Sequence, residues 1–135
     1  MRTRKQVADE MLVLAAQARQ VEAFEHLAIR WHPRLFRYAH RLTGDSEGAR
    51  DAAQEAWVAI ARGLGRLEDP ATFGPWALRI TSRRCADWIA RRQKIRRRTT
   101  VLDAAAEATT EPDPREDDLA RVRDALRRLD PDRRA

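Results

Sequence analysis

Cysteine is nearly absent from this 135-residue chain, which contains only Cys85. A single cysteine excludes an intramolecular disulfide, and its phase on the apolar side of a predicted helix favours a role as a small buried hydrophobe. Long apolar runs are also lacking, so no segment reaches the length of a membrane span. The basic N-terminus is interrupted by Asp9 and Glu10 and has no signal-peptide cleavage site. We therefore expect a cytoplasmic protein without a membrane partner.

The common catalytic and metal-binding motifs are missing as well. The chain has no glycine-rich phosphate loop, no nucleophile elbow and no HExxH pattern. Its three histidines, His26, His32 and His40, do not have metal-ligand spacing with a cysteine or an acidic motif. The sequence accordingly predicts neither a catalytic site nor a metal or cofactor site.

Strand signals are few, and the composition favours helices. No run alternates between apolar and polar residues, and Ala, Leu, Arg and Glu dominate. We predict an all-α fold, in which a compact helical bundle is followed by a flexible acidic linker and a short C-terminal helix. The expected segments are a helical extension (residues 1–19), the bundle (20–98), the linker (99–115) and the final helix (116–135).

The first half of the chain shows one long apolar stripe at helical spacing. The stripe begins near Lys5 and comprises Val7, Met11, Leu14, Ala18, Val21, Phe24, Ala28, Trp31, Leu35, Ala39 and Leu42. Pro33 falls inside it, and because the stripe keeps its phase there, we expect a kink or a very short break. Gly44 then suits the left-handed residue that ends a helix, and Asp45 suits the N-cap of the next.

The next predicted helix, residues 46–64, has two distinct sides. Its buried side comprises Ala49, Ala53, Ala56, Trp57, Ile60 and Leu64. Its other side carries Asp51, Gln54, Glu55, Val58 and Arg62, spaced i, i+3, i+4, i+7 and i+11. Such a face is either plain solvent-exposed surface or a docking face for a partner helix, and periodicity alone does not choose between them.

The stretch at residues 75–98 predicts a helix with a cationic side. Pro75 suits the first helical position. The apolar side comprises Ala77, Leu78, Ile80, Cys85, Trp88, Ile89 and Ile95, and the opposite side carries Trp76, Arg79, Arg83, Lys94 and Arg97, with Asp87 as its one acid. Phe73, in the preceding loop, is placed to tuck under the start of this helix.

Charge is concentrated in this helix and balanced just after it. Residues 83–98 hold eight basic residues and one acid, whereas residues 103–118 hold seven acids and one arginine. Cations on one helix side can reach phosphates, and an exposed indole beside them can stack on an unpaired base. We interpret the helix as facing nucleic acid; the alternative is a merely solvated basic face. Further on, Leu119, Val122, Leu126 and Leu129 predict a short amphipathic helix.

Four strings in this order and spacing resemble region 2 of bacterial sigma factors of the sigma-70 superfamily. They are RLFRYAHRLTGD (34–45), ARDAAQEAWVAIARGL (49–64), FGPWALRI (73–80) and ADWIARR (86–92). The resemblance covers residues 20–98 and is greatest to the extracytoplasmic-function (ECF) group. The tail ALRRLDPDRRA resembles the opening of region 4, whose bulk lies outside the 135 residues; the chain is then a fragment or a stand-alone region 2.

The resemblance implies partners for particular positions. In the family, the residues matching Asp51, Gln54 and Glu55 bind the coiled coil of the β′ subunit of RNA polymerase core, and we include Val58 in that face. The loop at 67–73 and the helix after it would recognise and melt the promoter −10 element, capturing a flipped base of the non-template strand. The DNA-binding residues expected on this basis are Phe73, Trp76, Arg79, Arg83, Arg91, Lys94 and Arg97.

Two departures and two alternatives accompany this prediction. Many family members have Asn at the position of Arg83 and a basic residue at that of Ala90, so the preferred −10 sequence is not implied. The first alternative is a generic basic helical module that binds nucleic acid without polymerase. The second is a sigma-like interaction domain held by an inhibitory anti-sigma partner.

Overall fold

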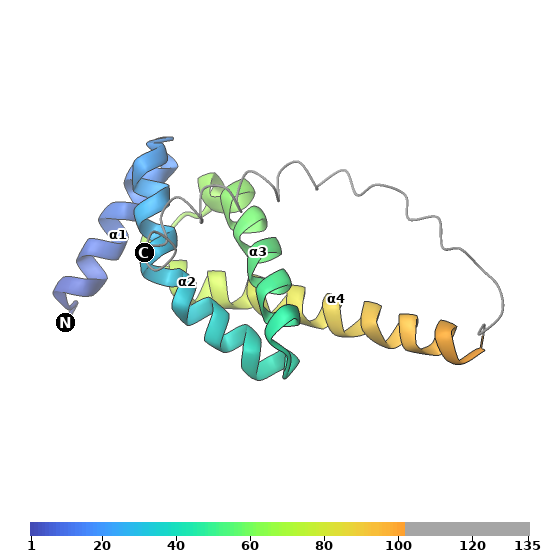
Figure 1. Cartoon of the computed structure of the whole chain (residues 1–135). Helices are drawn as coiled ribbons and strands as arrows, with labels where there is room; N and C mark the ends of the chain where they lie inside the picture. Colours follow the sequence, from blue (N-terminus) through green and yellow to red (C-terminus); the bar gives the residue numbers. More distant parts are fainter. Residues whose placement is uncertain (102–135) are drawn as a thin grey trace, which may run out of the picture.

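The computed structural model describes residues 1–101, which fold into a helical bundle (Figure 1). These residues form four α-helices and two short 3-10 helices and contain no strand, which confirms the all-α prediction. The predictions for residues 102–135, namely most of the acidic linker and the short C-terminal helix, lie outside the described residues.

Helix α1 (Arg4–Gln17) begins with a reciprocal cap between Thr3 and Gln6. The Gln6 backbone N–H donates to the Thr3 hydroxyl, and the Thr3 N–H donates to the Gln6 side chain. The buried residue of α1 is Val13, whereas Val7, Met11 and Leu14 are 43%, 65% and 55% exposed. The apolar stripe predicted for this helix was therefore wrong, because the side that packs on the bundle is centred on Val13.

The predicted apolar stripe is interrupted by a turn between α1 and α2 (Val21–Thr43). Arg19 has φ 63°, a left-handed conformation that turns the chain. The two helices then pack together, and the Arg30 guanidinium holds the Asp9 carboxylate at 2.6 Å. The turn resets the phase, which is why the predicted stripe misses the core in α1 and meets it from Phe24 onward in α2.

Helix α2 continues through Pro33 without a break. Ala28, Trp31, Leu35 and Ala39 are buried as predicted, but Val21 and Leu42, at the two ends of the helix, are exposed. The helix ends at Gly44, with φ 67°, and Asp45 caps α3 (Ser46–Gly63) by accepting the Gly48 N–H at 2.9 Å. The predicted stop and restart are confirmed.

The core lies where α2, α3 and α4 meet. Its largest buried side chains include Trp57, Phe73, Leu27, Leu35 and Ile60, and all six residues predicted for the buried side of α3 are buried. Cys85 is 1% exposed and packs with Ala39, Ala49 and Ala52, as expected for a small hydrophobe. Burial raises the pKa of its thiol.

Helix α4 (Phe73–Val101) is longer than predicted at both ends. The 3-10 helices η1 (Leu64–Arg66) and η2 (Pro70–Thr72) precede it, and η2 runs directly into it. Pro75 is thus the third residue of the helix, still within the first turn, where a backbone N–H has no intrahelical acceptor. Residues 99–101 were predicted to begin the linker but are helical.

The C-terminal part of α4 extends past the rest of the bundle (Figure 1). Every residue from Arg91 to Thr100 is exposed, including Ile95, which was predicted for the apolar side. Beyond the ends of the other helices, α4 has no neighbouring element to pack against. Its residues there are therefore exposed to solvent on all sides. Among residues 1–101, each helix is too polar or too short to cross a lipid bilayer.

Candidate binding surfaces

The outward side of α3 is a narrow strip. Asp51 is exposed, Gln54 and Glu55 are half-buried, and Val58 is only 5% exposed. Because α2 and α4 both pack against α3, little of its circumference remains open. Val58 was predicted at the centre of an accessible face, and this was wrong. We call Asp51, Gln54 and Glu55 the polar face of α3.

Glu55 is held by a residue of the neighbouring helix. The Arg91 guanidinium donates to both Glu55 carboxylate oxygens, at 3.3 and 3.4 Å. The Glu55 side chain is 14% exposed and that of Arg91 49%. The contact joins one predicted polymerase-binding residue to one predicted DNA-binding residue.

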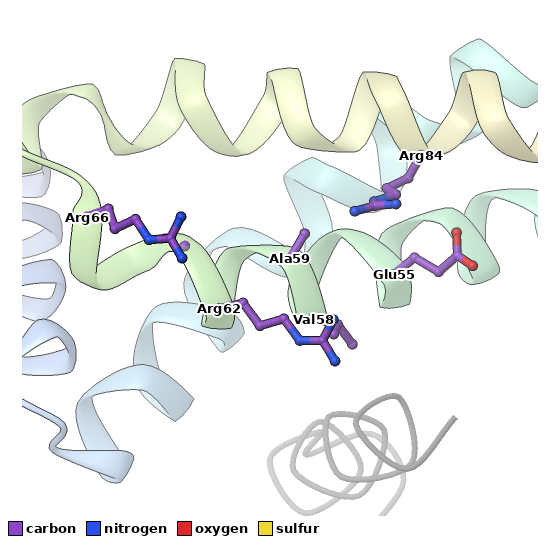
Figure 2. Close-up of a pocket in the computed structure, with 7 residues that line it drawn as sticks. Glu55, Val58, Ala59, Arg62, Arg66 and Arg84 are labelled. Carbon is purple, nitrogen blue, oxygen red and sulfur yellow. The ribbon is translucent and has the colours of Figure 1, made fainter. Parts of the chain in front are cut away.

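A groove follows the polar face toward the C-terminal end of α3 (Figure 2). It has a volume of about 240 Å³ and is lined by Glu55, Val58, Ala59, Arg62, Gly63, Arg66 and Arg84. Figure 2 shows that Arg84 reaches from α4 toward α3, and Arg66 comes from η1. We call this hollow the arginine groove, after its three guanidinium groups.

The basic face of α4 comprises Arg79, Arg83, Arg91, Lys94 and Arg97, all exposed. Arg79 and Arg83 lie one turn apart, Arg91 lies beside Glu55 of α3, and Lys94 and Arg97 lie on the projecting end of the helix. Their exposure agrees with the predicted cationic side. Phosphates could approach four of the five directly, whereas Arg91 is held by Glu55.

Trp76 was predicted to stand on the exposed, charged side of α4, but it is half-buried. Its ring lies 6.0 Å from that of Phe73, centroid to centroid, and packs so closely on Gly63 that a Cβ there would lie 3.0 Å from it. The remaining edge of the indole lines a second groove together with Ile80, Arg83 and Asp87. A base could reach that edge, not the whole ring.

Phe73 does not face solvent at all. It is 2% exposed and packs edge-on against Trp31, with ring centroids 5.5 Å apart. The prediction that it tucks under α4 is confirmed, but its burial prevents direct contact with a ligand. Its ring instead packs beside that of Trp76, tilted by 55°.

Sequence reasoning did not assign a role to Arg66 or Arg84. Helical periodicity treats one helix at a time, whereas these two side chains meet Arg62 only because η1 and α4 fold against α3. A run of basic residues was the one available signal for Arg84. Within residues 1–101, no three His, Cys, Asp or Glu side chains gather in a way that could hold a metal ion.

Comparison with known families decides the classification. The sequence model of Sigma-70 region 2 matches residues 27–95, just over half of the chain. The chain belongs to the Sigma-70 region 2 family. The match spans α3, both short helices and most of α2 and α4, so it includes both faces and the arginine groove.

Curated relatives within the sigma-70 family are named as sigma factors, and two mycobacterial ones carry the ECF designation. The chain is 30% identical over 114 residues to RNA polymerase sigma factor CarQ of Myxococcus xanthus, covering 84% of this chain and 66% of that protein. It is 32% identical to ECF RNA polymerase sigma factor SigE of Mycolicibacterium smegmatis, covering 60% of this chain and 31% of that protein. It is 34% identical to ECF RNA polymerase sigma factor SigM of Mycobacterium tuberculosis, covering 65% of this chain and 45% of that protein.

The family model thus shows membership in Sigma-70 region 2, and two of these relatives are named as ECF sigma factors. The chain spans from about a third to about two thirds of the length of these three relatives. No solved structure gives a significant match.

Proposed function

We propose that the chain is the core-binding and −10-recognising unit of an ECF sigma factor. In this proposal the polar face of α3 binds the β′ coiled coil of RNA polymerase core. The basic face of α4, with the open edge of Trp76, binds the non-template strand of an opened promoter −10 element. The chain has no catalytic activity of its own and works in the cytoplasm, where its polymerase and promoters are.

One observation carries the proposal: a single bundle presents two faces of different charge on adjacent helices. Asp51 and Glu55 offer carboxylates on α3, while five cations line α4. A protein helix and a DNA strand could therefore be bound at the same time. The half-buried Trp76 can still contact a base that has left the duplex, an extrusion that costs a few kcal/mol, through the part of the indole that lines the second groove.

The relatives support the same proposal, because each is named as an RNA polymerase sigma factor. An anti-sigma partner that covered the polar face of α3 would compete with polymerase core for the same residues. A generic nucleic-acid module would need the basic face of α4 alone, and its polar face would be ordinary surface.

Core binding tests the proposal. The triple variant Asp51→Ala, Gln54→Ala, Glu55→Ala should bind purified polymerase core at least about tenfold more weakly than the parent chain. The substitutions remove two carboxylates and an amide that would contact polar groups of the polymerase, and those groups would be left without partners. Glu47→Ala, an exposed acid in the first turn of the same helix, is the matched control and should bind core normally. Equal binding by the triple variant and the parent would contradict the proposal.

A further inference from the structure

The arginine groove brings together three cationic side chains from three separate elements. Arg62 lies on α3, Arg66 on η1 and Arg84 on α4. The Arg84 side chain is 27% exposed, and its contact with Asp87 is long, at 3.7 Å. Arg66 is exposed. The hollow between them is large enough, at about 240 Å³, to receive one side chain from a partner.

The groove continues directly from the polar face of α3. Glu55 lines its near end, and Arg62 lies seven residues, or two helical turns, further along. Two turns correspond to about 10 Å along the helix axis. The outer strip of α3 is therefore acidic in its first half and basic where it meets η1 and α4.

From this arrangement we propose, on the basis of the proposed function, that the arginine groove receives an acidic side chain of the polymerase helix that docks on α3. That helix would carry a cation opposite Asp51 and Glu55 and a carboxylate about two turns away. The paired charges would set the direction in which the partner helix lies across α3, because the reversed orientation would place like charges together.

The lining favours a protein carboxylate over a phosphate. Glu55 contributes a negative charge to the same groove, which opposes a nucleic-acid strand that brings one negative charge with every phosphate, whereas a protein helix can place a single carboxylate beside the arginines and a cation beside Glu55. Val58 and Ala59 add apolar surface that suits the methylene groups of Glu or Asp. Guanidinium groups bind carboxylates through two parallel hydrogen bonds, so one acid can engage Arg66 or Arg84 in a fixed geometry.

A charge-reversal pair tests this. The double variant Arg66→Glu, Arg84→Glu should weaken binding of the labelled full chain to polymerase core by at least about tenfold, measured by fluorescence anisotropy. The control Arg37→Glu, Arg41→Glu makes the same change of net charge with two exposed arginines of α2 and should leave core affinity unchanged. Arg66→Gln, Arg84→Gln should give a smaller loss, and replaces the first variant if circular dichroism shows that it does not fold.

The remaining outcomes overturn the inference in distinguishable ways. Unchanged core binding by both Arg66/Arg84 variants would contradict it. The same anisotropy measurement includes the double variant Asp51→Ala, Gln54→Ala of the polar face. If this variant loses core binding while the Arg66/Arg84 variants bind normally, the proposed function stands and only the groove is wrong. If neither set weakens core binding, the proposed function fails too. If the groove variants instead lose affinity for single-stranded DNA without core, the groove binds phosphate and the inference is wrong.

Discussion

Arg91 of α4 donates to both carboxylate oxygens of Glu55 of α3 across the junction of the two helices. The pair links the two surfaces that the proposed function assigns to different partners. A cation from polymerase core that approached Glu55 would meet a carboxylate already occupied by Arg91. The guanidinium released by that exchange would then be available to DNA phosphate.

Arg91→Ala should therefore strengthen core binding slightly while weakening binding to single-stranded DNA. Because Arg91 is half-exposed, the pair contributes about 0.2–1 kcal/mol, and the gain in core affinity should be no more than about fivefold. Titration of core with the labelled variant measures it. Lys94→Ala, an exposed cation of the same face, should weaken DNA binding alone. Weaker core binding by Arg91→Ala would show that Arg91 itself contacts the polymerase.

The close packing of α3 on α4 depends on Gly48. A Cβ at this position would lie 2.6 Å from the Trp88 ring, well inside contact distance. Gly48→Ala should lower the free energy of unfolding by about 1–3 kcal/mol, the usual cost of overpacking. Gly65→Ala, where a Cβ meets nothing within 4 Å, is the control. Urea denaturation compares them, and equal stabilities would contradict the packing at Trp88.

The cap of α3 should make stability depend on acid. The hydrogen bond from the Gly48 N–H lowers the pKa of the Asp45 carboxyl below its ordinary value. A backbone hydrogen bond from Glu47 acts in the same direction, and together they outweigh burial, which would raise the pKa. A carboxylate whose pKa is lower in the folded state stabilises the fold above its unfolded pKa, and the effect is lost as pH falls through the folded value.

Asp45→Asn retains a side-chain acceptor but cannot titrate. The stability advantage of the parent chain over Asp45→Asn should shrink as pH falls through the folded pKa of Asp45, followed by urea denaturation across the acid range. An advantage independent of pH would show that the ionised cap adds nothing beyond its hydrogen bond.

The thiol of Cys85 should react slowly in the folded chain. It is 1% exposed, and burial raises its pKa, so both access and the thiolate fraction are reduced. Alkylation by iodoacetamide, followed by mass spectrometry, should be much slower in buffer than in denaturing urea. Equal rates in the two solutions would contradict burial of this residue of α4 against α2 and the first half of α3.

The sequence predicted the parts of the fold that local chemistry controls. Gly44 and Asp45 mark a helix end and a helix start through backbone geometry and a side-chain cap, and both are seen. The buried side of α3 follows from helical spacing alone. The prediction that Val7, Met11 and Leu14 face the core was wrong. The turn at Arg19 resets the helical phase between α1 and α2, and no glycine or proline marks that turn in the sequence.

The candidate sites were predicted less completely, since accessibility depends on neighbouring helices. Val58 and Trp76 have the spacing of exposed residues on their own helices, but a second element covers each of them in part. The arginine groove needs three elements to meet and has no counterpart in any single periodic pattern. Resemblance supplied the predicted roles of Asp51 and Gln54, which the geometry alone leaves open.

The central claim is that this bundle binds an opened promoter strand selectively when it is held by polymerase core. The most direct test measures its affinity for a fluorescent −10-like single strand and for a scrambled strand of equal composition, each with and without core. We predict clear preference for the −10-like strand in the presence of core, and a loss of about 1–3 kcal/mol for Trp76→Ala on that strand. Equal affinity for both strands, with core making no difference, would contradict the account.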